Sequence, residues 1–351
     1  MDIREARADD NLELRELQAR CPQGTTLIVS TVNTPDFFAR VKVYEDYKVY
    51  VACEDNRIIG SAACAVRDAV VSGKIAKVGH EFQLFVDPEY RGRRIAGQLH
   101  QVREEYLKHQ GCALSYALIM EGNIPSMRYI ARQGFKRHRT LVMPGIPVFK
   151  ELEIKSKGKV RAIVPEDLDS VADLLNETWQ SYELYEPVSA DSLARLIERM
   201  PAYDYDNIFV LEGDGKILSC LGFWDWSQVM QITVEALSLK MRAIGLLIDV
   251  VGRFRPIPRG PKPGDRLRQM VLTPIGFKNT AYLAVLLRYV NNQALLKGIQ
   301  QMFYLCEKDD PLLSILKGFI HIDTSMHLYL KPLQENVSIS QRPVFINALD
   351  L

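Results

Sequence analysis

Short, mainly apolar stretches between turn-forming residues mark the first half of the chain, and each predicts a β-strand. The stretches 47–52 and 58–66 lie on either side of Asp55-Asn56, which favours a turn, so they predict a pair of antiparallel strands. A third strand is predicted over 81–86, where apolar and polar residues again mix over a short run. The chain therefore begins with a sheet rather than with a helical bundle.

Helical spacing of apolar residues appears next, over 95–108. The residues that repeat at this spacing are Ile95, Leu99, Val102, Tyr106 and Leu107. A strand over 114–119 and a short helix over 125–132, which ends at Gly134, complete the first half. The order of strand, strand, strand, helix, strand and helix predicts an α/β domain whose mixed sheet is partly antiparallel.

The second half repeats this order, which predicts an internal duplication. The opening phrase 3–14, a strand followed by acidic residues that favour a helix start, returns as 160–175. The later elements predicted for the second half are strands 208–211, 217–223 and 267–272, a helix 279–296, a strand 302–306 and a short helix before Gly318-Phe319. The sequence thus predicts two tandem domains of similar architecture.

Length and local composition place the boundaries of these domains. A chain of 351 residues exceeds the size at which a single core usually stops growing. A polar, basic run at 155–159 has no apolar anchors and is typical of a linker. We expect a first domain over 1–152, a linker over 153–159, a second domain over 160–333 and a tail over 334–351. The basic, proline-rich stretch 252–264 predicts a surface loop, with a lid over an acidic acceptor as the alternative.

Composition excludes several classes of function. The 44 Lys and Arg residues nearly balance the 43 Asp and Glu residues, so no nucleic-acid partner is expected. The six cysteines are scattered singly, which favours a reducing cytoplasm over a disulfide framework. No apolar run approaches the roughly 18 residues that span a bilayer, so no membrane partner is expected. The histidines lack helical metal spacing, and no metal site is predicted.

The candidate chemistry lies where the strand 81–86 leads into the helix that starts at Ile95. The turn between them carries Arg91, Arg93 and Arg94 and contains Gly92. Backbone N–H groups at a helix N-terminus have no intrahelical acceptors and lie at the positive end of the helix dipole. The sequence therefore predicts a site for an anion such as a pyrophosphate, with the arginines adding positive charge.

Two segments resemble the motifs of the GNAT superfamily of N-acetyltransferases. The spacing from Arg91 to Ala96 is similar to that family's acetyl-CoA-binding turn, Arg/Gln-x-x-Gly-x-Gly/Ala. The stretch 123–135, from Asn123 to Gly134-Phe135, resembles the helix beside the pantetheine arm. Phrases at 115–117, 123–129, 139–141 and 147–148 are similar to plant hookless-type proteins and related prokaryotic acetyltransferases. The resemblance implies a GNAT fold for the first domain and a degenerate GNAT-like fold for the second.

The resemblance also implies which residues hold acetyl-CoA and which catalyse transfer. The cofactor-binding residues that it implies are Leu84, Phe85, Val86, Arg91, Gly92, Arg93, Arg94, Ile95, Ala96, Gly97, Asn123, Ser126 and Tyr129. Glu81 is the candidate base, with His80 or Glu121 acting through water as alternatives. Tyr129 is the candidate acid, because Ile130 stands where the family often has a tyrosine. Arg94 stands where the family usually has glycine, which predicts an altered affinity.

The activity implied is direct transfer of an acetyl group from acetyl-CoA to a primary amine within a ternary complex. A small-molecule acceptor is favoured, and a protein lysine or N-terminal amine is the first alternative. A non-catalytic CoA-binding or scaffolding protein is the second alternative, because of Ile130 and Arg94. The second domain is expected to shape the acceptor site or to form an oligomer contact, which leaves a homodimer open.

Overall fold

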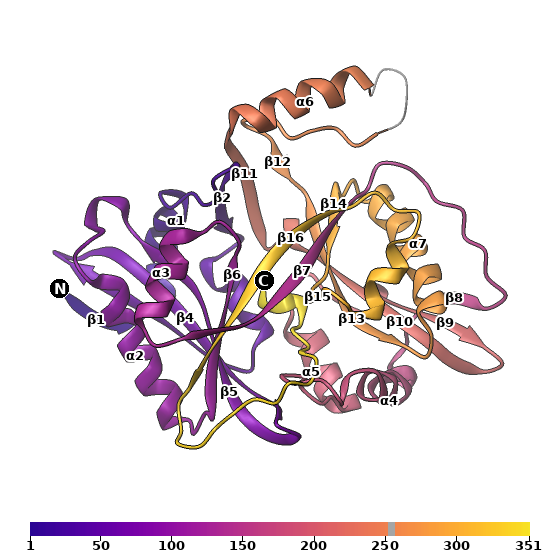
Figure 1. Ribbon diagram of the computed structural model, residues 1–351, viewed down its shortest axis with the longest axis horizontal. Coiled ribbons are helices and arrows are strands. Elements are labelled where there is room, and N and C mark those ends of the chain that lie inside the picture. The colour runs from indigo at the N-terminus through magenta and orange to yellow at the C-terminus, as the bar shows by residue number, and fades with distance from the viewer. Residues whose placement is uncertain (252–256) are drawn as a thin grey trace.

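One mixed β-sheet runs through the computed structural model, which describes residues 1–251 and 257–351 (Figure 1). Within these residues the sheet has thirteen strands, twelve of them in one continuous order. That order is β1-β3-β4-β5-β6-β16-β7-β14-β13-β10-β9-β8, and β15 (Cys306–Glu307) pairs with β7 at the side. The predicted α/β class with a mixed sheet is confirmed.

The first half of the chain supplies one end of this sheet. Its strands are β1 (Asp2–Glu5), β3 (Asp46–Glu54), β4 (Arg57–Val71), β5 (Lys74–Val86) and β6 (Leu114–Met120). Leu14 and Leu17 of α1 (Asn11–Ala19) are fully buried on one face. On the other face lie α2 (Ile95–His109) and α3 (Ile124–Arg132), because the apolar stripe of α2 packs against β4 and β5.

The second half supplies the other end and, apart from a segment inserted at 226–267, repeats much of this order of elements. Its strands are β8 (Lys159–Ala162), β9 (Ile208–Gly213), β10 (Lys216–Asp225), β13 (Gln269–Phe277) and β14 (Gln301–Phe303). Three of its helices are α4 (Leu168–Trp179), α5 (Ala190–Arg199) and α7 (Thr280–Leu296). The chain order β13, α7 and β14 matches β5, α2 and β6, and in both cases the two strands are parallel neighbours.

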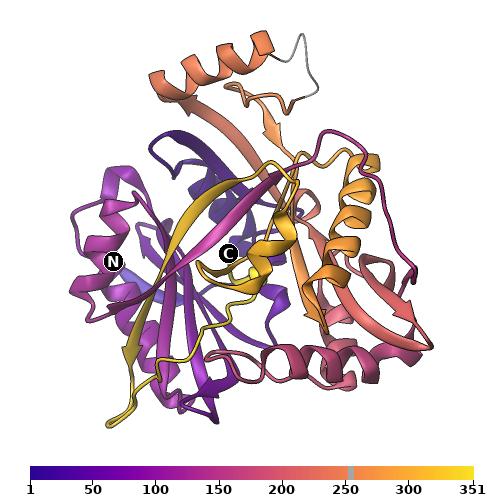
Figure 2. The same cartoon turned by 45° about the vertical axis from the view of Figure 1, so that its right-hand side comes forward.

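Two long strands are exchanged between the halves. After α3 the chain enters β7 (Lys136–Pro147), which pairs with β14 of the second half. Near its other end, β16 (Ile322–Pro332) returns to the first half and lies between β6 and β7. The two strands cross between the halves in both views (Figures 1 and 2). Each half therefore contributes a strand to the sheet of the other.

A smaller sheet and a shared core also join the halves. Strand β2 (Leu27–Asn33) pairs with β11 (Met230–Leu237), which also pairs with β12 (Arg266–Leu267). Helix α6 (Leu239–Val251) follows β11 and extends away from the main sheet (Figure 2). The largest apolar cluster includes Val43 and Tyr44 from the first half and Trp224 and Val271 from the second. Burial of apolar side chains between the halves thus stabilises the two halves together.

Several predicted elements differ in extent from those observed. Of the strand predicted over 267–272, Leu267 ends β12, and the rest lies in β13, which begins at Gln269 and runs on to Phe277. The stretch 273–277, between this predicted strand and the predicted helix, is therefore strand rather than turn. The strand predicted over 302–306 is divided into β14 and β15. Part of the predicted insertion 252–264, at 252–256, lies outside the described residues. Among the described helices, none has the length and apolar character needed to cross a membrane.

Candidate active site

The turn that follows β5 is fixed by the carboxylate of Asp87, which is 1% exposed. Arg20 Nε donates to this carboxylate across 3.0 Å, and Arg57 Nη2 donates across 2.9 Å. The backbone N–H of Glu89 donates to its other oxygen across 3.1 Å. Because a buried carboxylate needs such partners, Asp87 determines how the chain leaves the sheet. Sequence reasoning missed this residue, although Asp87-Pro88 is a turn-forming pair directly after the predicted strand.

The first turn of α2 presents backbone N–H groups that no side chain caps. Its N-cap residue, Arg94, has a left-handed backbone with φ of 64°. Gly92 also has a positive φ, of 83°, and a Cβ there would meet nothing within 4 Å. Glycine is thus favoured at this position by backbone conformation rather than by space. The turn is exposed and is suited to an anion, as the sequence predicts.

Three other helices of the chain have a side chain that accepts a hydrogen bond from one of their first N–H groups. Asn123 caps α3, Ser189 caps α5 and Asn279 caps α7. Helices α1 and α4 continue directly from short 3₁₀ turns. By contrast, α2 begins after an exposed turn, and no side chain of the described residues caps its first N–H groups. This end of α2 is therefore prepared for a partner from outside the chain.

The side chains of the three arginines in the turn differ in how many contacts they make with the rest of the chain. Arg91 Nε donates to the last carbonyl of β5 across 3.3 Å. Arg93 forms an ion pair of 3.2 Å with Glu54, and its guanidinium lies 4.7 Å from the ring centre of Tyr90. Arg94 is exposed, and its side chain has no hydrogen bond or ion pair within the described chain. All three side chains are exposed at the surface around the predicted anion site.

Beside this turn, β5 and β6 separate. They pair in parallel at three positions, and the last of these joins His80 to Tyr116. Beyond it, no described strand pairs with the β6-facing edge of β5 over 81–86. The register between β4 and β5 shifts here, and Gln83 adopts a positive φ of 50°. Such a bulge leaves backbone groups unpaired at the point where the strands part.

The predicted cofactor residues of β5 lie on both faces of the sheet. Leu84 and Val86 pack with Ile95 and Leu99 of α2. Phe85 faces the opposite side, against α1. Their side chains therefore join the sheet to its covering helices, and their backbone supplies the unpaired edge. Ala96 and Gly97 follow in the first turn of α2 and are half-buried.

Helix α3 completes this side of the site. Asn123 accepts a hydrogen bond of 3.3 Å from the backbone N–H of Ser126, so its side chain caps the helix. The Tyr129 hydroxyl donates to the carbonyl of Ala96 across 2.8 Å and ties α3 to the first turn of α2. Burial raises the pKa of Tyr129 to about 12, so the hydroxyl keeps its proton. Ile130 is buried in the core and cannot replace it as a proton donor.

The predicted base, Glu81, lies beneath α2 and is 4% exposed. His100 Nδ1 lies 2.9 Å from its carboxylate, and Arg103 Nη2 lies 3.0 Å away. Burial alone would raise the pKa of Glu81, but Arg103 and His100 outweigh it and the net shift is downward. Glu121, in contrast, is exposed after β6. The structure thus separates the three candidate bases, because His80 lies on the opposite face of β5 from Glu81.

The corresponding region of the second half is closed by the protein itself. The Asn279 side chain accepts from the N–H of Ala281 across 2.8 Å, so the start of α7 is capped. Trp179 Nε1 donates to the carbonyl of Ile275 across 2.5 Å, and the Tyr203 hydroxyl donates to that of Thr273 across 3.1 Å. The chain therefore already supplies the contacts that the first half leaves open.

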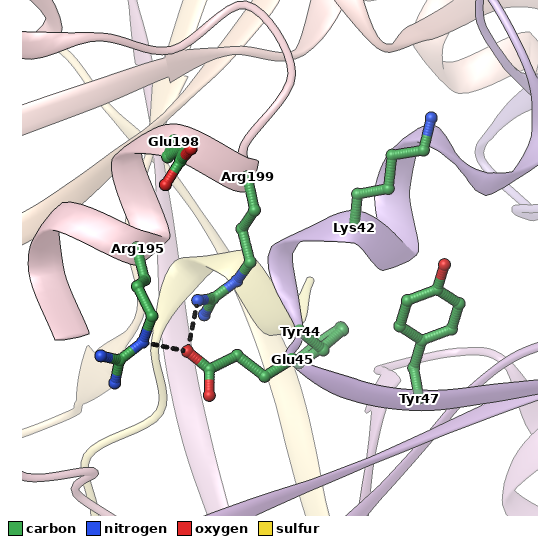
Figure 3. A pocket seen from close by; sticks show the side chains of 7 residues that line it. All are labelled: Lys42, Tyr44, Glu45, Tyr47, Arg195, Glu198 and Arg199. Atoms are coloured by element: carbon green, nitrogen blue, oxygen red, sulfur yellow. Dashed lines mark hydrogen bonds and ion pairs between the residues drawn. The ribbon is translucent and has the colours of Figure 1, made fainter.

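A hollow of about 500 Å³ lies where the two halves meet, between the 3₁₀ helix Phe37–Val43 and α5 (Figure 3). One oxygen of Glu45 accepts from Arg195 Nε at 3.1 Å and from Arg199 Nη1 at 2.8 Å. The residues that line the hollow are Lys42, Tyr44, Glu45, Tyr47, Arg195, Glu198 and Arg199. Sequence reasoning missed this hollow, because its walls come from segments about 150 residues apart.

Known proteins resemble the chain at two levels. Residues 11–135 match the acetyltransferase (GNAT) family. Over 91 residues the chain is 31% identical to glucosamine 6-phosphate N-acetyltransferase of Trypanosoma brucei brucei. This match covers 26% of the chain and spans 59% of the length of that curated relative.

Solved structures are similar over nearly the whole chain. Saccharomyces cerevisiae N-myristoyltransferase with bound myristoyl-CoA covers 98% of this chain and 85% of its own, with a TM-score of 0.65 at 13% identity. A glucosamine N-acetyltransferase region of a fungal multi-domain β-N-acetylglucosaminidase covers 94% of this chain and 38% of its own, with a TM-score of 0.59 at 14% identity. At these identities the likeness concerns the fold.

Proposed function

We propose that the chain, whose residues 11–135 match the acetyltransferase (GNAT) family, transfers an acetyl group from acetyl-CoA to a primary amine in a ternary complex. One observation carries the proposal. The uncapped start of α2 lies beside the edge of β5 that pairs with β6 only as far as His80. Acetyl-CoA supplies the activated acyl group, and its phosphates and amide-containing arm need these two kinds of partner.

The turn before α2 is the proposed phosphate site. N–H groups from Gly92 to Gly97 give hydrogen-bond donors at the positive end of the helix dipole. Arg91, Arg93 and Arg94 add positive charge around it. Arg93 is held by Glu54, so its head is preorganised, whereas Arg94 is free to turn toward a ligand. Charge-assisted hydrogen bonds of this kind are among the strongest that proteins form.

The edge of β5 and the start of α3 are the proposed site for the arm of the cofactor. The backbone of Leu84, Phe85 and Val86 offers alternating donors and acceptors to an extended amide chain. Asn123 and Ser126 lie at the start of α3. A backbone N–H near Phe85 is placed to stabilise the oxyanion that develops on the thioester carbonyl. The bulge at Gln83 releases such groups from strand pairing.

Tyr129 is the proposed proton donor to the leaving thiolate. Its hydroxyl lies at the junction of α2 and α3 and remains protonated over the whole working range, since its pKa is raised to about 12. Its present acceptor, the Ala96 carbonyl, is also within reach of the helix's own N–H four residues later. Releasing the hydroxyl to a thiolate therefore costs little. Glu81 is proposed either as the base or as the residue that positions α2, and its buried ion pairs support the second role.

A small amine that carries a negative group is the favoured acceptor. The curated relative is a glucosamine 6-phosphate N-acetyltransferase, and the hollow between the halves holds Lys42, Arg195 and Arg199 beside Glu45 and Glu198. A protein amine is the alternative, favoured by the fold shared with N-myristoyltransferase. We also propose a cytoplasmic location, a homodimer and a second domain without a working cofactor site. The capped start of α7 supports the last of these.

Calorimetry with CoA tests the cofactor site. The double variant Arg91→Glu with Gly92→Glu puts two carboxylates at the phosphate site and should reduce CoA binding below detection. Lys108→Glu with Gly111→Glu is the matched control at the opposite end of α2, because Gly111 also has a positive φ, of 78°. The control should keep wild-type affinity. Equal CoA affinity in both double variants would refute the site.

Release of free thiol from acetyl-CoA tests the activity. Glucosamine, glucosamine 6-phosphate and a lysine-containing peptide should be compared as acceptors. We expect the phosphorylated amine to react faster than glucosamine, and faster than the peptide. CoA binding without thiol release for any amine would favour the non-catalytic alternative.

A further inference from the structure

His80 lies at the vertex where β5 and β6 part, because its pairing with Tyr116 is the last between these strands. The imidazole is 1% exposed and stacks between two rings. The Tyr116 ring lies 4.6 Å away at an interplanar angle of 6°, and the Phe82 ring lies 4.7 Å away at 16°. Since successive side chains of a strand alternate in direction, His80 faces away from α2, which Glu81 contacts.

The hydrogen bonds around His80 determine which ring nitrogen carries the proton. His80 Nδ1 lies 3.0 Å from the Tyr44 hydroxyl oxygen. That hydroxyl donates its single proton to Asp350 Oδ1 across 3.0 Å, so toward His80 it can only accept. The neutral ring must therefore carry its proton on Nδ1, which leaves a lone pair on Nε2. Nε2 has no hydrogen-bond partner in the part of the chain that the structure describes.

The charges around the ring keep it neutral. Asp350 also accepts a hydrogen bond of 2.9 Å from the Tyr116 hydroxyl and forms an ion pair of 2.9 Å with Arg67. Burial lowers the pKa of His80 to about 4, with Arg67 acting in the same direction and Asp350 opposing both. The titratable and charged groups that face the ring are Tyr44, Tyr116, Asp350, Arg67, Arg40 and Glu81.

We propose that His80 is the base that takes a proton from the acceptor ammonium, with Tyr44 and Asp350 orienting its ring and balancing the charge that it gains. This proposal rests on the proposed acetyltransferase function. The ammonium proton moves to Nε2, and the freed lone pair forms a C–N bond with the thioester carbonyl carbon. The C–S bond then breaks and the thiolate takes a proton from Tyr129. The acceptor nitrogen then loses its second proton to solvent. Tyr129 takes up a proton from solvent, and His80 releases to water the proton that it gained.

The two adjacent candidates, His80 and Glu81, differ in what already occupies them. Glu81 contacts two cationic or hydrogen-bonding partners on α2, so taking up a proton would weaken both contacts. His80 has an unoccupied nitrogen and a carboxylate 3.8 Å from its other nitrogen, which favours the charged ring once a proton arrives. The balance of contacts therefore favours His80 as base and Glu81 as a positioning residue.

The hollow of Figure 3 gives the acceptor an approach to this face of β5. Tyr44 belongs to both sites, because it lines the hollow and its hydroxyl contacts His80. The cofactor turn, by comparison, is at the start of α2 on the opposite face of β5. The two substrates would thus reach the vertex from opposite sides of the sheet, so both can be bound at once.

His80→Asn is the primary test, because the asparagine amide keeps a donor toward Tyr44 and removes Nε2. We expect kcat for the best amine acceptor to fall about 100-fold or more, with CoA affinity and the melting temperature unchanged. His327→Asn is the matched control, because His327 is 3% exposed and its Nδ1 contacts the Thr140 hydroxyl at 3.2 Å. This control should retain wild-type kcat. A His80→Asn kcat within threefold of wild type would overturn the proposal.

Chemical rescue gives a readout that a structural role would not produce. His80→Gly should leave a flat slot between Tyr116 and Phe82. Added imidazole should raise the kcat of this variant at least tenfold. Restoration should follow the fraction of imidazole that is neutral as the pH changes. Folded His80→Gly that binds CoA but gains nothing from imidazole would count against the base. A wild-type protein that binds CoA yet acetylates no amine would overturn the proposed function itself, and this assignment with it.

Discussion

Replacement of Tyr129 by phenylalanine separates two roles of one hydroxyl by their magnitudes. As an anchor, the hydroxyl contributes one hydrogen bond of 2.8 Å to the Ala96 carbonyl. A neutral hydrogen bond contributes about 1 kcal/mol net. A chain of 351 residues has an unfolding entropy of roughly 0.7 kcal/mol per kelvin near 60 °C. Loss of the anchor should therefore lower the melting temperature by about 1–2 °C.

As a proton donor, the same hydroxyl has a much larger effect on the rate. General acid catalysis contributes roughly 10²–10⁴-fold. The lower limit corresponds to about 2.7 kcal/mol in the activation barrier. Because burial raises the pKa of Tyr129 to about 12, the wild-type rate should show no loss of this acid up to about pH 10. We expect Tyr129→Phe to lower kcat about 100-fold while the KM for acetyl-CoA stays within twofold of wild type.

The assay is thiol release at saturating acetyl-CoA, with thermal unfolding measured on the same samples. Tyr106→Phe is the matched control, because Tyr106 lies on α2 and its hydroxyl donates to Asp46 away from the proposed site. This variant should retain kcat. If Tyr129→Phe kept kcat within threefold of wild type and lost only 1–2 °C of melting temperature, the hydroxyl would be an anchor alone and the proton-donor role would be withdrawn.

Three further predictions concern stability. Glu81→Gln should lower the unfolding free energy by about 3 kcal/mol in urea titrations, because Arg103 would keep a buried charge without its partner; a loss below 1 kcal/mol would contradict a positioning role. Asn279→Ala should cost about 1 kcal/mol and leave CoA affinity unchanged, since it caps α7 in the half without a proposed cofactor site; weaker CoA binding would argue for a site there. The pKa of His80 falls from 6.5 to about 4 on folding, so its contribution is complete above pH 6.5 and is lost as pH falls to 4. Urea titrations between these pH values should show a loss of up to about 3 kcal/mol that His80→Asn abolishes.

The sequence predicts well those features that depend on neighbouring residues. The turn from Arg91 to Ala96 is local chemistry, and so are the strand before it and the apolar stripe of α2. The two halves also repeat the same order of strands and helices, which is visible as a repeated pattern. The boundaries of the second half are less accurate, because β13 and α7 join with almost no turn and the pattern shows no break there.

The features that the sequence does not predict depend on pairing between distant segments. No local sequence pattern predicts that β16 lies beside β6 with His327 opposite Ile119. Tyr44, His80 and Asp350 also meet from three remote segments, and each looks ordinary in its own stretch of chain. Asp350 in particular resembles any surface carboxylate until folding buries it. Contacts of this kind follow from topology, which periodicity does not encode.

Because β7 and β16 pair with strands of the opposite half, neither half forms a complete sheet from its own strands. Similarity to the GNAT family ends at residue 135, one residue before β7 begins. A fragment cut after residue 152 would expose the edge of β6 that β16 now covers and would leave β7 without β14. Such unpaired edges promote aggregation. The smallest piece of this chain in which these strand edges all stay paired is therefore the two halves together.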